Sequence, residues 1–143
     1  MLVQDTAPAA QRMTFGQMLE RVRYDGAYPT RARAESTVRA VLAALGRQIT
    51  GDERVALAAC LPPEAARALT STAPGIEQLT GWGFVKDVAT RLGGTQATAR
   101  WDTGAVLGVV ADLAGPDLLG RVLAGLPGGY ALLFGRAELV RAA

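Results

Sequence analysis

The sequence predicts an all-α protein made of two tandem copies of a roughly 60-residue four-helix unit, packed as one pseudo-symmetric helical domain. Three observations support this prediction. Apolar residues recur at helical spacing between capping residues, no useful length of chain alternates with a period of two, and the chain repeats itself after 65 residues. With 143 residues, half of them hydrophobic, the chain can bury a core without disulfides or metals.

The first two helices are expected at about residues 14–24 and 30–48. Thr14 and Gln17 form the pattern of a capping box, in which side chain and backbone cap each other at the helix start. Thr30 is the expected cap of the second helix. That helix places a row of apolar side chains on one face: Ala34, Val38, Val41, Leu42, Leu45 and Ile49.

A short third helix and a fourth complete the first copy. Thr50 and Glu53 predict a second capping box, and the helix that it opens ends near Cys60. Pro63 then starts the fourth helix, at residues 64–70, since proline is tolerated in a first helical turn. In the second copy, Gly93-Gly94-Thr95 and Gly115-Pro116-Asp117 mark the corresponding boundaries.

The repeat is visible in an ungapped comparison of residues 30–69 with residues 95–134. Eleven of the 40 positions are identical, more than a shared alanine-rich composition supplies. The expected organisation begins with a disordered N-terminal tail at residues 1–12. Two repeats in one compact domain follow, at residues 13–70 and 80–136, with a linker between them at residues 71–79.

The motif Arg39-Ala40-Val41-Leu42, followed by Leu61-Pro62, resembles a bacterial family catalogued as domain of unknown function twenty-two sixty-seven. The resemblance covers roughly residues 14–134, and the second copy carries Gly104 in the place of the motif's arginine. It implies a helical fold of tandem copies of this unit, and it implies no particular activity.

The residue types that support catalysis are scarce. The chain has no histidine, which removes the usual general base and the commonest metal ligand. Cys60 pairs with Gly125 in the repeat, which predicts a buried thiol, and Asp52, Glu53 and Asp117 are explained as first-turn helix charges. We therefore expect no enzyme activity and no catalytic, cofactor-binding or metal-binding residues.

The chain is also expected to be cytoplasmic, without membrane contact. Its first residues lack the basic and apolar regions of a signal peptide. The longest uncharged apolar stretch, residues 122–135, is too short to span a bilayer and is interrupted by Pro127 and glycines.

A candidate interaction surface lies on the predicted helix at residues 95–114. If Val106, Leu107 and Val110 face the core, Trp101 points to the opposite side. The small residues near it share that side: Gly104, Ala105 and Gly108. This stripe has two interpretations. It is either a close-packed side of a central helix, with Trp101 covered by the last helix, or an exposed docking surface with Trp101 as anchor.

A candidate basic patch comprises Arg21, Arg23, Arg31 and Arg33. Arginine contacts phosphates, and nearby tyrosines stack on bases. Acidic residues interleave with these arginines and the formal net charge is only +2, which favours an ordinary solvated, salt-bridged face.

The function predicted from these features is that of a non-enzymatic protein-interaction module, which self-associates or docks another protein. One alternative is a carrier of an apolar small ligand in a pocket between the repeats. A second alternative is weak nucleic-acid association through the arginines of the first repeat. No cofactor is expected.

Overall fold

The structure is a computed structural model that describes residues 13–136, and within this range it contains helices and no strand. The all-α prediction is therefore confirmed for the described residues. The tail predicted at residues 1–12 lies outside them. The helices are α2 (Phe15–Gly26), α3 (Arg31–Gly46), α4 (Gly51–Cys60), α5 (Pro63–Thr70), α6 (Gly81–Leu92), α7 (Gln96–Ala124) and α8 (Tyr130–Leu133).

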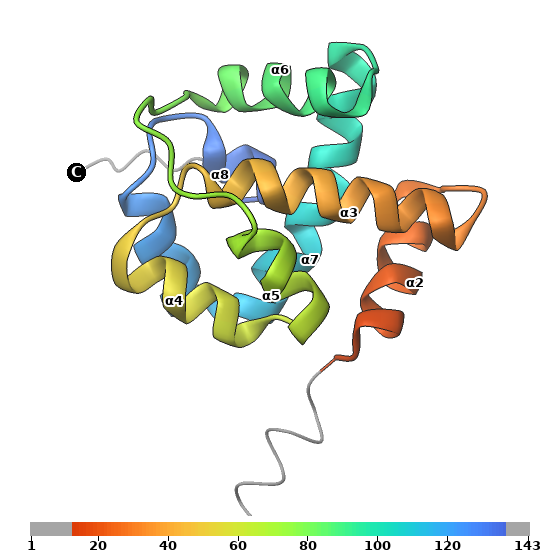
Figure 1. Cartoon of the computed structure of the whole chain (residues 1–143), viewed down its shortest axis with the longest axis horizontal. Coiled ribbons are helices and arrows are strands. Elements are labelled where there is room, and N and C mark those ends of the chain that lie inside the picture. Colours follow the sequence, from red (N-terminus) through yellow and green to blue (C-terminus); the bar gives the residue numbers. More distant parts are fainter. Residues whose placement is uncertain (1–12, 137–143) are drawn as a thin grey trace, which may run out of the picture.

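Helix α3 crosses the middle of the molecule, with α6 on one side and α4 and α5 on the other (Figure 1). Helix α2 packs on both α3 and α7, and α6 likewise packs on both α7 and α3. The short helix α8 rests on α7, and α4 packs on α5 and α7. Each half of the chain therefore contributes helices that pack on the other half.

Threonines begin most of the helices, as the sequence predicts. Thr14 forms the expected capping box with Gln17, and the side chains of Thr30 and Thr95 accept bonds from first-turn amides. The capping box predicted for Thr50 is wrong, because its side chain makes no cap bond. Gly51, the first residue of α4, has a φ of 68°, so the chain turns before the Thr50 hydroxyl reaches the amides of the first turn.

Helix α7 consists of two helical stretches joined by a kink. Gly115 has a φ of 82° and a ψ of 163°, outside the helical range, and Pro116 follows it. Proline lacks the amide proton and clashes with the preceding turn of a continuous helix, so a new helical stretch begins there. The boundary predicted at Gly115-Pro116-Asp117 is confirmed.

One continuous hydrophobic core joins the two halves. Leu42, Leu45, Leu107 and Val110, predicted to face the core, are completely buried. Phe84 and Tyr130 meet edge to face, with ring centroids 5.5 Å apart. The Cys60 side chain is only half-buried, in contrast to the buried thiol that the sequence suggested.

The segment predicted as a linker, residues 71–79, is non-helical but firmly attached to the first half of the chain. The Thr72 hydroxyl donates to the carbonyl of Ala43 at 2.8 Å, and the amide of Leu79 donates to the Gln48 side chain at 2.9 Å. These bonds fix where α6 begins relative to α3.

Candidate functional site

The structure brings together the four residues predicted as an interaction surface. Trp101, Gly104, Ala105 and Gly108 line a groove of about 320 Å³ on α7, and Arg21 and Asp25 of α2 form its opposite wall. We call this depression the Trp101 groove. Its position follows from the packing of α2 across α7, which the sequence did not predict.

The indole of Trp101 is 58% exposed, and its orientation is fixed by one polar contact. Its Nε1 donates a hydrogen bond of 2.8 Å to the carbonyl of Gly26, the last residue of α2. The contact comes from α2 and not from the last helix, which the sequence offered as the alternative cover. Much of the ring therefore faces solvent while its polar edge is satisfied.

The glycines beside Trp101 are not required by packing within the described chain. A Cβ added at Gly108 would meet nothing within 4 Å, and one added at Gly104 would meet only the Arg100 side chain, at 3.2 Å. A glycine inside a helix costs about 1 kcal/mol relative to alanine. The small size of these residues leaves the groove open.

Charged residues form the rim of the Trp101 groove. Arg21 donates from Nη2 to Asp112 at 2.6 Å and from Nε to Asp25 at 3.1 Å, so it links α2 with α7. The hydrogen bond to Asp112 raises the pKa of Arg21 above its usual value. All three side chains remain partly in solvent, where such pairs stabilise a fold by no more than about 1 kcal/mol.

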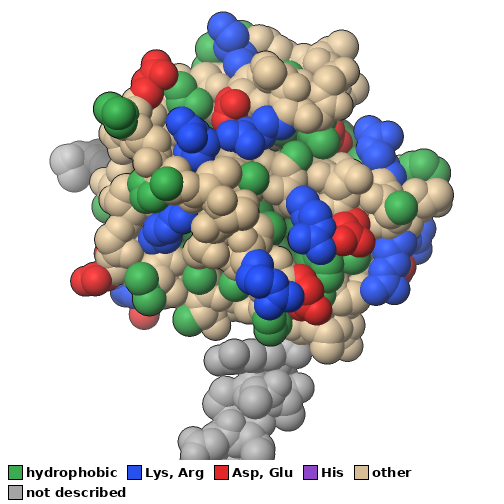
Figure 2. Space-filling view, viewed as in Figure 1, with side chains coloured by type: hydrophobic (Ala, Val, Ile, Leu, Met, Phe, Trp, Pro, Cys, Tyr) green, Lys and Arg blue, Asp and Glu red, His purple; other side chains and the backbone are tan. Residues whose placement is uncertain are grey.

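The four arginines of the predicted basic patch have different surroundings. Arg21 is paired with two carboxylates and Arg23 is paired with Glu20, while Arg33 lies over the Tyr28 ring, 5.6 Å from its centroid. Arg31 reaches towards Gly16 of α2. Two of the four charges are thus compensated by acidic neighbours. On the face formed by α3, α5 and α6, basic and acidic side chains are likewise interspersed (Figure 2).

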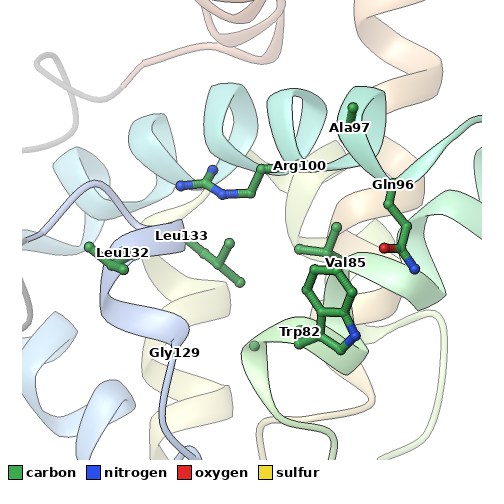
Figure 3. A pocket seen from close by; sticks show the side chains of 9 residues that line it. Trp82, Val85, Gln96, Ala97, Arg100, Gly129, Leu132 and Leu133 are labelled. Atoms are coloured by element: carbon green, nitrogen blue, oxygen red, sulfur yellow. The ribbon is translucent and has the colours of Figure 1, made fainter.

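A second, more apolar groove of about 500 Å³ also opens along α7 (Figure 3), and Arg100 lines both grooves. We call this second groove the apolar groove. Three helices supply its walls: Trp82 and Val85 from α6, Ala97 and Arg100 from α7, and Leu132 and Leu133 from α8. It lies among helices of the second half of the chain, whereas the sequence suggested a ligand pocket between the halves. Sequence reasoning missed it because no single helix carries its pattern.

The floor of the apolar groove depends on two glycine backbones in contact. The amide of Gly81 donates to the carbonyl of Gly128, and a Cβ at Gly81 would lie 2.8 Å from the carbonyl carbon of Gly129. The Tyr130 hydroxyl donates to the carbonyl of Leu79 at 2.9 Å. These contacts fix α8 against the start of α6, so the groove is preformed.

The buried polar groups of the core are structural in character. Asp102 accepts a hydrogen bond of 2.5 Å from the Tyr28 hydroxyl, and burial followed by this bond raises the pKa of Tyr28. Within residues 13–136 no three histidine, cysteine, aspartate or glutamate residues are placed to hold a metal ion. None of the helices in this range is long and apolar enough to cross a membrane.

Comparison with known proteins identifies one family. A family described as an uncharacterized conserved protein (DUF2267) matches residues 15–133, nearly the whole described chain. The family that the sequence motif suggested is therefore confirmed. No curated protein matches the chain.

Proposed function

We propose that this chain, which belongs to the DUF2267 family, is a non-enzymatic protein-interaction module that self-associates through the Trp101 groove. The observation that carries the proposal is an exposed tryptophan beside two glycines. A Cβ at Gly108 would meet open space, and one at Gly104 would meet only the end of the Arg100 side chain. Gly104 and Gly108 weaken the helix without being required for packing in the described chain. A partner that fills the groove would offset this cost.

The state of Trp101 supports its role as an anchor. Tryptophan is enriched among the residues that contribute most to protein interfaces. The bond from Nε1 to Gly26 already holds the ring, so little side-chain freedom remains to be lost on docking. Burying the exposed face of the ring would contribute on the order of 2 kcal/mol.

The charge pattern favours a second copy of the chain as the occupant. Arg21 and Arg100 lie at the groove together with Asp25, and Asp112 is paired to Arg21. A two-fold interface places the same patch on both subunits, so the patch has to complement itself. A rim with both signs of charge meets that requirement, whereas a rim of one sign would repel its copy.

The test is the molar mass at rising protein concentration, measured by light scattering. The wild-type mass should rise with concentration, and Trp101→Glu should give a folded monomer. Trp82→Glu is the matched control, since it changes the other exposed tryptophan, in the apolar groove, and should leave association intact. A wild-type chain that stays monomeric at high concentration contradicts the proposal.

The two-copy architecture belongs to the same proposal. Its support is the matched burial of residues 65 positions apart: Val41 and Val106 are both fully buried, as are Leu42 and Leu107. The reciprocal packing of α2 and α6 on α3 and α7 is the arrangement expected of two related units. Since the units share one core, residues 13–79 expressed alone should not fold, and a cooperative unfolding transition of that fragment would contradict this expectation.

A further inference from the structure

In the part of the chain that the structure describes, the apolar groove combines a preformed apolar interior with a single charged residue. Val85 and Leu133 are buried at its base, while Trp82 and Leu132 are 65% and 54% exposed at its edges. Its volume of about 500 Å³ lies within the ~300–1,000 Å³ range usual for small-ligand sites. Exposed apolar side chains that surround a concave surface are typical of a binding site.

Arg100 gives the apolar groove its charge. In Figure 3 its guanidinium extends from α7 along the edge of the groove towards Leu132 and Leu133. Among residues 13–136 it is the only charged residue that lines the groove. Within residues 13–136 no carboxylate lies at ion-pair distance from Arg100. The groove therefore offers apolar contacts together with one uncompensated positive charge.

The corresponding surface of the first half differs in the features that make the apolar groove. Counting 65 residues back, Arg100 corresponds to Glu35, and Leu132 corresponds to Arg67. Phe15 is the first residue of α2, as Gly81 is of α6, and Arg39 covers the Phe15 ring, 5.3 Å from its centroid. The first half therefore carries charged side chains on the surface that corresponds to the apolar groove. Of the two described halves, the apolar surface is found in the second alone.

We infer that the apolar groove binds a small amphiphile made of an alkyl chain and a carboxylate, with the chain against Trp82, Val85 and Leu133 and the carboxylate on Arg100. The guanidinium fork matches a carboxylate in shape and charge. The inference does not rest on the proposed self-association. Arg100 lines both grooves, but the apolar contacts come from Trp82, Val85 and Leu133, which line the apolar groove and not the Trp101 groove.

Titration calorimetry with decanoate below its critical micelle concentration tests the inference. The expected result is saturable binding of one decanoate per chain. Affinity should rise about fourfold for each methylene added, hence about fifteenfold from octanoate to decanoate. Decyltrimethylammonium, which has the same alkyl chain and the opposite charge, should bind more weakly than decanoate.

Two pairs of variants locate the site. Arg100→Gln should weaken decanoate binding about two- to fivefold and remove the preference over decyltrimethylammonium, while Lys86→Gln, on the outer side of α6, should change neither. Ala97→Phe, at an exposed position that lines the groove, should block binding. Ala32→Phe, the corresponding exposed position of α3, should not.

Three results would overturn the inference: equal affinity for the two amphiphiles, decanoate binding that survives Ala97→Phe, and a groove that instead holds a second copy. The last would appear as a wild-type mass that Ala97→Phe lowers and decanoate also lowers. If Ala97→Phe proves unfolded by circular dichroism, Leu132→Ser, at the exposed edge of the groove, replaces it and should weaken decanoate binding several-fold.

Discussion

The Tyr28 hydroxyl donates a hydrogen bond of 2.5 Å to Asp102 Oδ1, although 74 residues separate the two along the chain. Tyr28 follows α2 and Asp102 lies in α7, and both side chains are buried. The contact ties the end of α2 to the helix that it crosses, next to the bond between Trp101 and Gly26. It therefore helps to form the wall of the Trp101 groove.

Replacing Tyr28 with phenylalanine should destabilise the protein by about 1–3 kcal/mol, because Asp102 is left buried without its donor. The measurement is the free energy of unfolding from urea denaturation at neutral pH. Tyr24→Phe is the control, since Tyr24 is 81% exposed and should show no change. Equal denaturation midpoints for Tyr28→Phe and the wild type would mean that the buried carboxylate finds another partner.

Alkaline pH should destabilise the wild-type protein. Burial raises the pKa of Tyr28 and of Tyr130 above the ordinary value near 10, so the folded state keeps protons that the unfolded state loses. This contribution to stability is complete below about pH 10 and is lost as the pH rises towards the folded-state values. The loss should be about 1.4 kcal/mol per pH unit for each tyrosine.

The comparison that isolates this effect is Tyr130→Phe. Its free energy of unfolding should fall less steeply with pH above 10 than that of the wild type, in urea titrations at several pH values. If the free energy of unfolding falls equally steeply with pH in both proteins, Tyr130 does not cause the loss of stability at alkaline pH.

Truncating the central leucines should be costly. Leu42→Ala and Leu107→Ala each remove a fully buried side chain from the shared core, and each should lower the free energy of unfolding by about 2–5 kcal/mol. Leu132→Ala, at a half-exposed position of α8, serves as the control and should cost far less. Chemical denaturation measures the free energy of unfolding of all three variants. If the midpoint of Leu42→Ala or Leu107→Ala equalled that of the wild type, the packing described would be contradicted.

The sequence predicted the elements well where the signal is local. Caps such as Thr14 and Thr30 and the break at Gly115 depend on residues a few positions apart, so they could be recognised directly. The capping box predicted at Thr50 was wrong because the spacing of Thr50 and Glu53 does not reveal the left-handed conformation of Gly51.

The candidate sites were predictable only in part. The stripe around Trp101 belongs to one helix, so its residues were found from periodicity, while its wall from α2 was not. The apolar groove depends on the contact of Gly81 with Gly129, which joins segments distant in sequence. The burial of Asp102 has the same origin, because its partner Tyr28 comes from the other half of the chain.

Replacing either of two glycines with alanine should change the stability of the fold in opposite directions. A Cβ at Gly46 would overlap the carbonyl oxygen of Leu69, where α3 and α5 approach closely, so Gly46→Ala should destabilise the fold. Gly108→Ala meets open space and should be neutral or stabilising by up to about 1 kcal/mol. Thermal unfolding of both variants measures the contrast, and a destabilised Gly108→Ala would show that Gly108 has a packing role after all.

Filling the Trp101 groove from within should abolish self-association without harming the fold. Gly108→Leu places a side chain in the groove, at a position where an added Cβ would meet nothing within 4 Å. Gly120→Leu is the matched control, since Gly120 also lies on α7 in open space, outside the groove. Both variants add a leucine at a position that is not buried, and added surface hydrophobicity by itself would promote association. A mass that falls for Gly108→Leu and stays for Gly120→Leu at equal concentration would therefore reflect loss of the groove and not a change in surface hydrophobicity. If both variants associate like the wild type, the interface lies elsewhere on the molecule.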